Sequence, residues 1–402
     1  MRSNVVAYTS ECTFLVSKGN VSYIYLKRSQ CTSLYTIHQT MKLYKLYLIG
    51  LFAALTLGAC SSDNDDNSNG GGNSKNENAN MITAGVPQEV TRLEFPRIKG
   101  GTSTIIVHET EDYGVNYCTE FDVAKKSQRW SCYAVYKSNN CKNWERSKWR
   151  NPNGVSWQGK TWYKDPFQTD PAIDNNAQPG ISEFSSSSYQ DISYFERGHI
   201  VASEDRVCNQ DVNGQTFYMT NMQPQRHEFN GGIWEKMEEK IRSFLSMTMS
   251  TQAAHANDTM YVCKGGTIDK AEQILCYTRN KFIVPKYFFA AVLIKNNSGY
   301  KAIGFWFEHK AYPSTEKLSA HIVNINKLEE LTGIDFFCNL PDDIENKVES
   351  QNITSEVLKG LWKIDDSAKS QHHTKKAVPS SRGNGFLRFV HVLYLYNSLF
   401  IL

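Results

Sequence analysis

The sequence predicts an α+β fold, because its expected strands and helices follow one another without the regular alternation of parallel βαβ units. It contains no internal repeat. With 40% hydrophobic and 21% charged residues, the composition is that of a globular protein with an ample core, which excludes a disordered or fibrous chain. The net charge is only +3, so any affinity for a polyanion must come from a local patch.

The first 80 residues differ from the rest of the chain. A short basic start at residues 41–45 precedes an apolar run at 46–59 that ends in Leu57-Gly58-Ala59-Cys60. A basic start, a short apolar stretch and small residues before a cleavage point describe a secretory signal peptide, here residues 41–59. Leu-Gly-Ala-Cys resembles a bacterial lipobox, which would make Cys60 the lipidated first residue of an exported outer-membrane lipoprotein. The alternative is a plain signal peptide with an incidental cysteine.

These features divide the chain into segments. We expect residues 1–40 to be a non-native upstream extension and residues 60–85, rich in Asn, Asp, Ser and Gly, to be a flexible tether. The folded part is expected over residues 86–366. Residues 367–402 are a polar linker and an apolar tail, either a membrane-seeking segment or a non-native extension. His372-His373 in this linker indicates a polar segment rather than a pair of metal ligands.

Within the folded part, the elements follow from side-chain pattern. Aromatic and β-branched runs bounded by turn residues predict strands at 130–136, 260–263, 282–285, 287–294 and 302–307. Apolar residues at three- and four-residue steps predict a helix at 233–247. A short helix is expected at 325–331, ended by Gly333, and another at 344–348.

Residues 142–164 interleave tryptophans with basic residues. Trp144, Trp149, Trp157 and Trp162 alternate with six lysines and arginines. This pattern suits a polyanion whose bases stack on the rings. It equally suits a solvated loop whose tryptophans pack on the core, and the sequence does not decide between the two.

Of the ten cysteines, seven lie after Cys60. An exported chain can form disulfides, and an odd count leaves at least one thiol free. Cys263 and Cys276 flank an expected hairpin and are the pairing that the sequence favours. No cysteine and histidine spacing indicates a zinc site.

The most informative motif is Glu196-Arg197-Gly198-His199. In an extended segment the side chains of Arg197 and His199 point the same way, because strand side chains alternate with period two. Asn230 and Glu238 follow on the expected helix, where eight residues at about 100° each leave the two about 80° apart.

Together these residues suit phosphodiester hydrolysis. His199 can serve as a general base, Arg197 can hold a phosphate, and Asn230 can supply an oxygen to Mg²⁺, which keeps most of its waters. Each residue alone also has a structural interpretation: a hydrogen-bonded histidine, an arginine paired with Glu196 or Asp205, a helix N-cap at Asn230 and a solvated Glu238.

The order of these motifs resembles the DNA/RNA non-specific endonucleases, a group of ββα-metal (His-Me finger) nucleases. Residues 194–203 are similar to the family's Asp-Arg-Gly-His segment, residues 221–225 to its Asn-x-x-Pro-Gln, and residues 230–238 to its Asn-x-x-x-Trp-x-x-x-Glu helix. The resemblance spans residues 117–349. It implies a mixed or antiparallel central sheet with flanking helices and a ββα-metal finger active site.

The resemblance also assigns roles. His199 would be the general base, Arg197 a phosphate contact and Asn221 a support of the site. Asn230 would bind Mg²⁺ directly and Glu238 through water, with Mn²⁺ as a substitute metal. Glu196 stands where the family usually has Asp, which leaves the orientation of its contacts open. A further basic residue should contact phosphate, with Arg129 and Lys137 as candidates by position.

The sequence therefore predicts an exported, lipid-anchored endonuclease, with residues 86–366 as its catalytic domain, that cuts DNA and RNA with little sequence preference and leaves 5′-phosphates. The alternative is a catalytically inactive surface lipoprotein that binds nucleic acid or glycan. The sequence does not decide between a monomer and a homodimer.

Overall fold

The computed structural model describes residues 75–182, 184, 189, 192, 194–246 and 256–364, and two short antiparallel strands, β1 (Tyr8–Thr9) and β2 (Cys12–Thr13). The chain divides into two compact units, Met1–Gly72 and Asn73–Leu402. The expected signal peptide, Cys60, His372-His373 and the tail lie outside the described residues. Among the described helices, none has the length and apolar character needed to cross a membrane.

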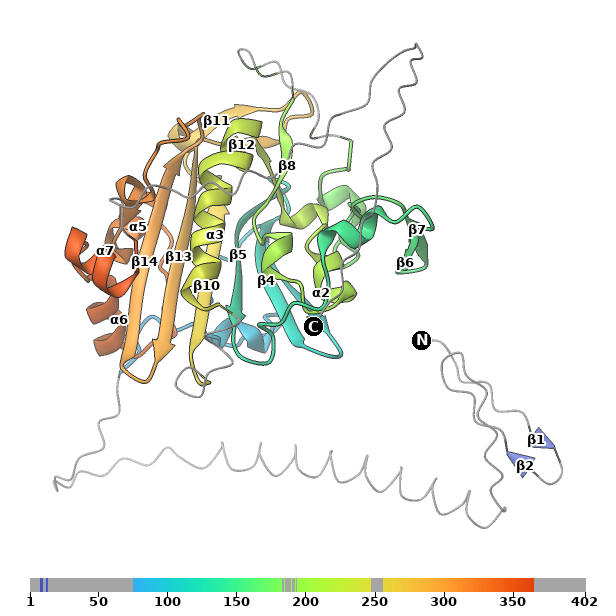
Figure 1. Cartoon of the computed structure of the whole chain (residues 1–402), viewed down its shortest axis with the longest axis horizontal. Helices are drawn as coiled ribbons and strands as arrows, with labels where there is room; N and C mark the ends of the chain where they lie inside the picture. The colour runs from blue at the N-terminus through green and yellow to red at the C-terminus, as the bar shows by residue number, and fades with distance from the viewer. Residues whose placement is uncertain are drawn as a thin grey trace, which may run out of the picture. The chain divides into compact units, whose positions relative to one another are not determined.

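The second unit is built on a seven-stranded sheet in which every neighbouring pair is antiparallel. Its spatial order is β15-β14-β13-β10-β5-β4-β3 (Figure 1). The strands are β3 (Ser103–Thr110), β4 (Gly114–Asp122), β5 (Ser127–Val135), β10 (Thr259–Gly266), β13 (Tyr287–Asn296), β14 (Gly299–Glu308) and β15 (Ile322–Val323). The expected α+β class and antiparallel central sheet are confirmed, although β3 and β4 were not foreseen.

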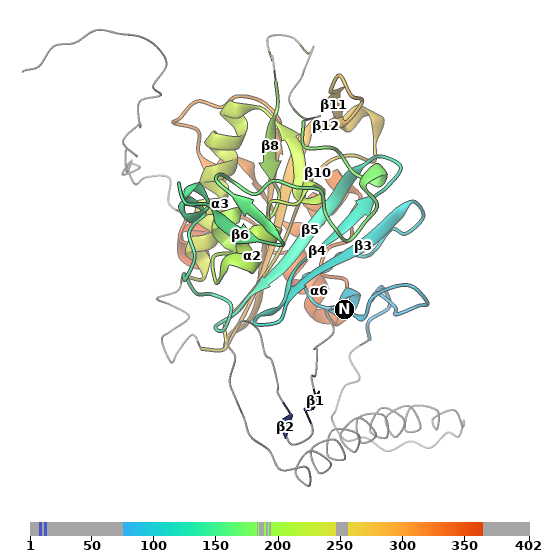
Figure 2. The same ribbon diagram turned by 90° about the vertical axis from the view of Figure 1, so that its right-hand side faces the viewer.

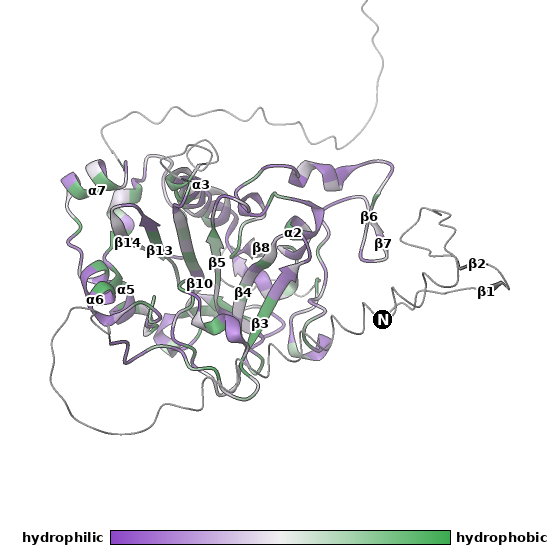
Figure 3. Cartoon of the chain, turned by 90° about the horizontal axis from the view of Figure 1, so that it is seen from below, coloured by the Kyte–Doolittle hydropathy of each residue, from purple (hydrophilic) through white to green (hydrophobic). Residues whose placement is uncertain are grey.

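Helices cover both faces of this sheet, because the side chains on both faces of its central strands are buried. In β13, Phe288, Ala290 and Val292 belong to one core cluster, whereas Phe289, Ala291 and Leu293 belong to the other. The first face packs against α3 (Glu235–Phe244) and α7 (Ser355–Leu361), and the second against α5 (Ile325–Thr332) and α6 (Asp342–Glu349). Figure 3 shows hydrophilic and hydrophobic sides on these outer helices.

The predicted helices are confirmed with shifted ends. In α3 the buried Met237 and Ile241 lie one turn apart on the sheet-facing side. Gly333 ends α5 with φ +75°, a left-handed conformation that glycine adopts without steric cost. Residues 75–85, which belong to the expected tether, contact this unit: the buried Asn80 donates to the carbonyl groups of Val90 and Pro96.

A hairpin followed by a helix carries the predicted motif. β8 (Glu196–His199) pairs with β9 (Met222–Gln225), and the chain then passes through a π-helical turn, η7 (Phe229–Trp234), into α3. A Cβ at Gly198 would lie 2.2 Å from the buried Gln225 side chain, so any larger residue there would displace that side chain. Figure 2 shows β8 near the upper end of the sheet.

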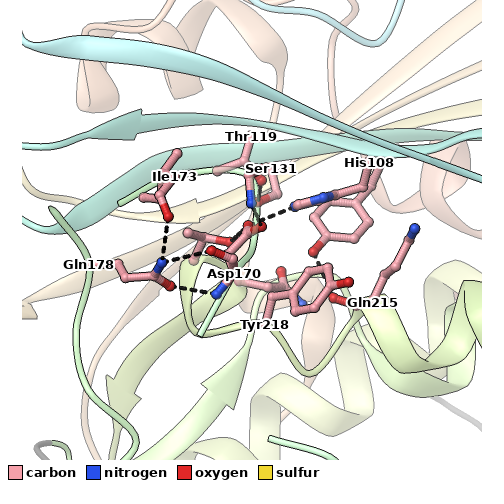
Figure 4. Close-up of polar contacts among 12 residues, drawn as sticks. His108, Thr119, Ser131, Asp170, Ile173, Gln178, Gln215 and Tyr218 are labelled. Atoms are coloured by element: carbon pink, nitrogen blue, oxygen red, sulfur yellow. Dashed lines mark hydrogen bonds and ion pairs between the residues drawn. The ribbon is translucent and has the colours of Figure 1, made fainter. Parts of the chain in front are cut away.

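A buried polar cluster fastens the segment before this hairpin to the sheet. Asp170 contacts His108 of β3 at 3.1 Å and accepts a hydrogen bond from the Thr220 hydroxyl. Its backbone carbonyl accepts from the Gln178 amide at 2.8 Å. Figure 4 shows Asp170 between His108 and Gln178. Because buried polar groups are stable only when paired, this cluster fixes the path of the chain through residues 165–181.

The tryptophan-rich segment contributes its own small core. It contains η2 (Arg146–Arg150), β6 (Val155–Trp157) and β7 (Lys160–Trp162). Trp149 and Trp157 are buried with Phe217 and Tyr218, and Trp144 and Trp162 pack against this cluster. Of the two sequence interpretations, the packing one is therefore correct for the tryptophan rings.

The predicted disulfide is wrong: Cys263 and Cys276 are both free, as are Cys118, Cys132, Cys141, Cys208 and Cys338. Cys263 lies in the central strand β10 and faces Cys132 of β5, which in turn faces Cys118 of β4. Cys276 lies in β11 (Ile274–Tyr277), which pairs with β12 (Ile283–Pro285) and not with β10. The expected hairpin between the two cysteines therefore does not form.

Candidate active site

One pocket collects the residues of the predicted motif. It is lined by Glu196, Arg197, His199 and Asn230, by three phenylalanines, by Tyr194 and by two residues that the sequence did not single out, Arg146 and Asp165. β8 supplies the first three and η7 supplies Asn230. The expected juxtaposition of a base, a cation and an amide oxygen is thus present.

Arg197 and His199 lie on the same side of β8, as the strand period predicts, and aromatic rings hold both. The His199 ring contacts Phe167 at 5.6 Å and Phe217 at 5.0 Å, centroid to centroid. The Arg197 guanidinium lies 4.2 Å from the centre of the Phe167 ring, and that of Arg146 lies 5.2 Å from the centre of the Phe217 ring. Each guanidinium therefore stacks on a ring that also contacts the imidazole.

The environment keeps His199 neutral. Burial and the charge of Arg146 hold the pKa of the imidazole well below its ordinary value of 6.5, because both disfavour the protonated form. Its Nε2 atom is buried without a hydrogen-bond partner among the described residues. A neutral imidazole has a free electron pair, so His199 can accept a proton at neutral pH.

Glu196 anchors Asn230. The Asn230 amide donates to Glu196 Oε2 at 2.8 Å, while Glu196 Oε1 lies 2.7 Å from His227 Nδ1. With its nitrogen committed to this carboxylate, the Asn230 side chain has its carbonyl oxygen available as a ligand. Asn230 is thus not a helix N-cap. The pair with Glu196 raises the pKa of His227, which is otherwise exposed.

Glu238 does not line this pocket among the described residues. Its carboxylate lies 3.2 Å from the buried Lys264 ammonium, which also lies 3.3 Å from Asp205. Burial raises the pKa of Glu238 to about 7. The expected offset of about 80° fails because Asn230 lies in the π-helical turn, which departs from helical backbone angles at Gly232.

Asn221 supports the site from behind. It is fully buried, accepts from the Val201 backbone N–H at 2.9 Å and donates to the carbonyl groups of Val201 and Thr216. These bonds tie the chain just after His199 to the segment before β9. Asn221 is not among the described residues that line the pocket, and its hydrogen bonds hold the backbone behind it.

Arg146 and Asp165 are the pocket residues that sequence reasoning missed. Arg146 donates to Asp165 Oδ2 at 2.6 Å, and Arg150 donates to the same oxygen at 3.2 Å. Arg129 instead pairs with Glu120 and Asp269 in the interior. Neither Arg129 nor Lys137 lines the described pocket, so Arg146 is the second cation beside His199.

The donor set fits a hydrated hard cation. No group of three His, Cys, Asp or Glu side chains that could hold a metal ion exists among the described residues. An amide oxygen beside a carboxylate is nevertheless suited to Mg²⁺, which often takes only one or two protein ligands and retains its waters. The pocket offers the Asn230 side-chain oxygen as such a donor, with the Glu196 carboxylate beside it.

Comparisons with known proteins show which family this chain belongs to. A model of the DNA/RNA non-specific endonuclease family matches residues 101–343. The chain is 28% identical over 206 residues to a nuclease of Nostoc sp., covering 49% of this chain and 68% of that protein. It is 26% identical to nuclease C1 of Cunninghamella echinulata, covering 46% and 77% of the two proteins. A chain in the crystal structure of the EndoG/EndoGI complex superposes with a TM-score of 0.45 and 18% identity, over 60% of this chain and 89% of that one.

Proposed function

The chain belongs to the DNA/RNA non-specific endonuclease family and is a nuclease, and from this premise we propose that His199 is its general base and that a divalent metal ion is its cofactor. The observation that carries the proposal is the pocket itself. It brings together a neutral imidazole, two guanidinium groups and an amide that a carboxylate holds in place.

His199 accepts the proton of the attacking water. Its depressed pKa keeps it unprotonated before reaction, and the Phe167 and Phe217 rings fix its plane. Arg197 and Arg146 hold the non-bridging oxygens of the scissile phosphate and stabilise the negative charge that develops there. For this, Arg146 exchanges its contact with Asp165 for one with the substrate.

Asn230 would hold the metal ion through its side-chain oxygen, with Glu196 orienting the amide. Glu238, which pairs with the buried Lys264 and does not line the described pocket, has no part in this arrangement. Mg²⁺ fits this oxygen donor set, and Mn²⁺ would substitute for it. When bound, the ion supplies positive charge that neutralises the leaving 3′ oxygen. No base-reading side chain is needed for these steps, so DNA and RNA would both be cut with little sequence preference.

The His199→Ala variant tests this function. We expect it to lose at least ~100-fold in cleavage of plasmid DNA with Mg²⁺, since positioned general bases contribute about 10²- to 10⁴-fold. Its far-UV circular dichroism and its DNA affinity in EDTA should match those of the wild-type protein. Retained cleavage would rule out His199 as the base.

A catalytically inactive nucleic-acid- or glycan-binding protein is the competing interpretation, and Glu196 in place of the usual Asp is the observation behind it. Plasmid nicking by the wild-type protein in Mg²⁺, abolished by EDTA, separates the two. A wild-type protein that binds DNA and does not nick it under either condition would favour the binding protein.

We further propose that the enzyme is exported and lipid-anchored at Cys60. The support is the basic start, apolar run and Leu-Gly-Ala-Cys sequence of residues 41–60. Mass spectrometry of the mature N-terminus tests it: a diacylglyceryl-modified Cys60 is expected as the first residue. An unmodified N-terminus, or one upstream of residue 60, would contradict the anchor.

A further inference from the structure

The segment of residues 142–164 is strongly basic. It carries six lysines and arginines and one glutamate, a formal charge of +5, in a chain whose whole net charge is +3. We refer to it as the basic arm. Figure 3 shows the part around β6 and β7 as hydrophilic. A local excess of positive charge is accommodated either by solvation of an exposed segment or by binding of an anion.

We propose that the basic arm is a second contact surface for the sugar–phosphate backbone, which binds the phosphates that flank the scissile one. This inference rests on the nuclease function proposed above. It extends the substrate-binding surface from the pocket to a segment that the catalytic residues do not use.

The arm is held rigidly against the rest of the unit. The buried Trp149 indole donates to Asn213 Oδ1 at 2.8 Å, and the Trp157 indole donates to Asp211 Oδ1 at 2.9 Å. A Cβ at Gly214 of α2 (Gln210–Gln215) would lie 2.5 Å from the Trp157 ring, so helix and arm pack without a gap. A rigid surface binds without a large cost in ordering.

The arm is continuous with the catalytic pocket. Arg146 belongs to both, and Asp165 of the pocket holds Arg146 and Arg150 together at the base of the arm. The Arg150 side chain is 64% exposed. A nucleic-acid strand seated on His199 and Arg146 therefore meets Arg150 as the next cation on the arm.

The lysines of the arm are placed for backbone contacts. Lys148 lies 5.2 Å from the centre of the Trp144 ring and Lys160 lies 5.7 Å from that of Trp162. Both lysines are exposed, so the rings position the ammonium groups while solvent or phosphate reaches them. Lys164 is also exposed.

The same contacts argue against base stacking. Trp149 packs edge-on against Trp144 and Trp157, and Trp157 stacks on Tyr218. Because Trp149 and Trp157 are buried in this packing, neither ring presents a face to an unstacked base. The tryptophans of the arm therefore serve its packing, and its exposed lysines and Arg150 present charge to the nucleic-acid backbone.

The test compares two triple variants with equal loss of charge. Lys148→Gln, Lys160→Gln and Lys164→Gln remove cations of the arm. Lys295→Gln, Lys327→Gln and Lys347→Gln remove exposed cations of β13, α5 and α6, and form the matched control. Affinity for a 30-bp DNA duplex is measured in EDTA at several salt concentrations, together with cleavage of the duplex and of bis(p-nitrophenyl) phosphate in Mg²⁺.

Each phosphate contact contributes about 0.9 to the slope of log affinity against log salt concentration. The arm variant loses three such contacts. Between 50 and 200 mM salt, the affinity of the wild-type protein should therefore fall about 40-fold more than that of the arm variant. We expect this difference, a raised KM for duplex DNA, an unchanged rate on the small ester, and wild-type behaviour in the control. Equal slopes in both triple variants would overturn the inference. So would a variant that loses affinity for an anionic polysaccharide and keeps that for DNA. A wild-type protein that binds DNA through the arm and cleaves neither substrate would contradict the proposed function alone.

Discussion

The Glu196→Asp variant tests how the site holds Asn230. It introduces the aspartate that the family motif usually has at this position, and it shortens the side chain by one methylene, about 1.5 Å. The Glu196 Oε2 to Asn230 Nδ2 distance of 2.8 Å would lengthen to about 4.3 Å, beyond hydrogen-bonding range, unless the backbone moves. The contact with His227 would lengthen in the same way.

Freed from Glu196, the Asn230 amide can rotate and present its nitrogen to the cation. Loss of a group that orients a ligand typically costs 10- to 100-fold in metal affinity or activity. We therefore expect the Mg²⁺ concentration for half-maximal cleavage to rise about 10- to 100-fold in Glu196→Asp. The maximal rate at saturating Mg²⁺ should change much less.

The assay is plasmid cleavage titrated with Mg²⁺. Glu196→Gln is the matched control, because its amide oxygen keeps the length needed to accept from Asn230, and its Mg²⁺ requirement should rise less than that of Glu196→Asp. A Glu196→Asp enzyme with the Mg²⁺ titration of the wild-type protein would refute the reasoning that Glu196 positions Asn230.

Three further outcomes follow from the charges around the site. Arg146→Gln removes a charge that lowers the pKa of His199, so the acid limb of the pH–rate profile for a small phosphodiester should move up towards pH 6.5; an unmoved limb would contradict it. Lys264→Met leaves Asp205 and Glu238 without their buried cation, so the free energy of unfolding in urea should fall by about 3–5 kcal/mol. The fall should be smaller at pH 5, where Glu238 is protonated. A fall below ~1 kcal/mol would be inconsistent with the ion pairs. Because folded His199 resists protonation, the wild-type protein should lose stability as pH falls below 6.5, and His199→Gln should reduce that loss; identical pH–stability curves would disprove it.

The sequence predicted those parts of the fold that local pattern encodes. Side-chain pattern predicted a helix at 233–247 and strands at 287–294 and 302–307, and the structure has α3, β13 and β14 in these places. β3 was missed because its residues are largely half-buried or exposed, which leaves a weak hydrophobic signal. The cysteine pairing failed because strand order, unlike strand position, is not local: β5 and β13 flank β10 from distant parts of the chain.

At the site, the order of motifs identified Arg197, His199 and Asn230 because one hairpin and the turn after it present them together. Arg146 and Asp165 come from a separate segment that reaches the pocket only by tertiary packing, so no spacing reveals them. The basic and aromatic pattern of residues 142–164 did mark the segment from which Arg146 comes. The partner of Glu238 was unpredictable, since nothing local marks Lys264 as a buried lysine.

The free cysteines provide an intrinsic probe of unfolding. Cys118, Cys132, Cys208, Cys263 and Cys338 are buried, whereas Cys141 and Cys276 are partly accessible. Burial raises the pKa of the Cys118, Cys132 and Cys263 thiols well above the ordinary value, and only a thiolate reacts quickly with an alkylating or disulfide reagent. Labelling of that row of three requires β4, β5 and β10 to separate. The rate at which a thiol reagent modifies them therefore measures how often the central sheet opens.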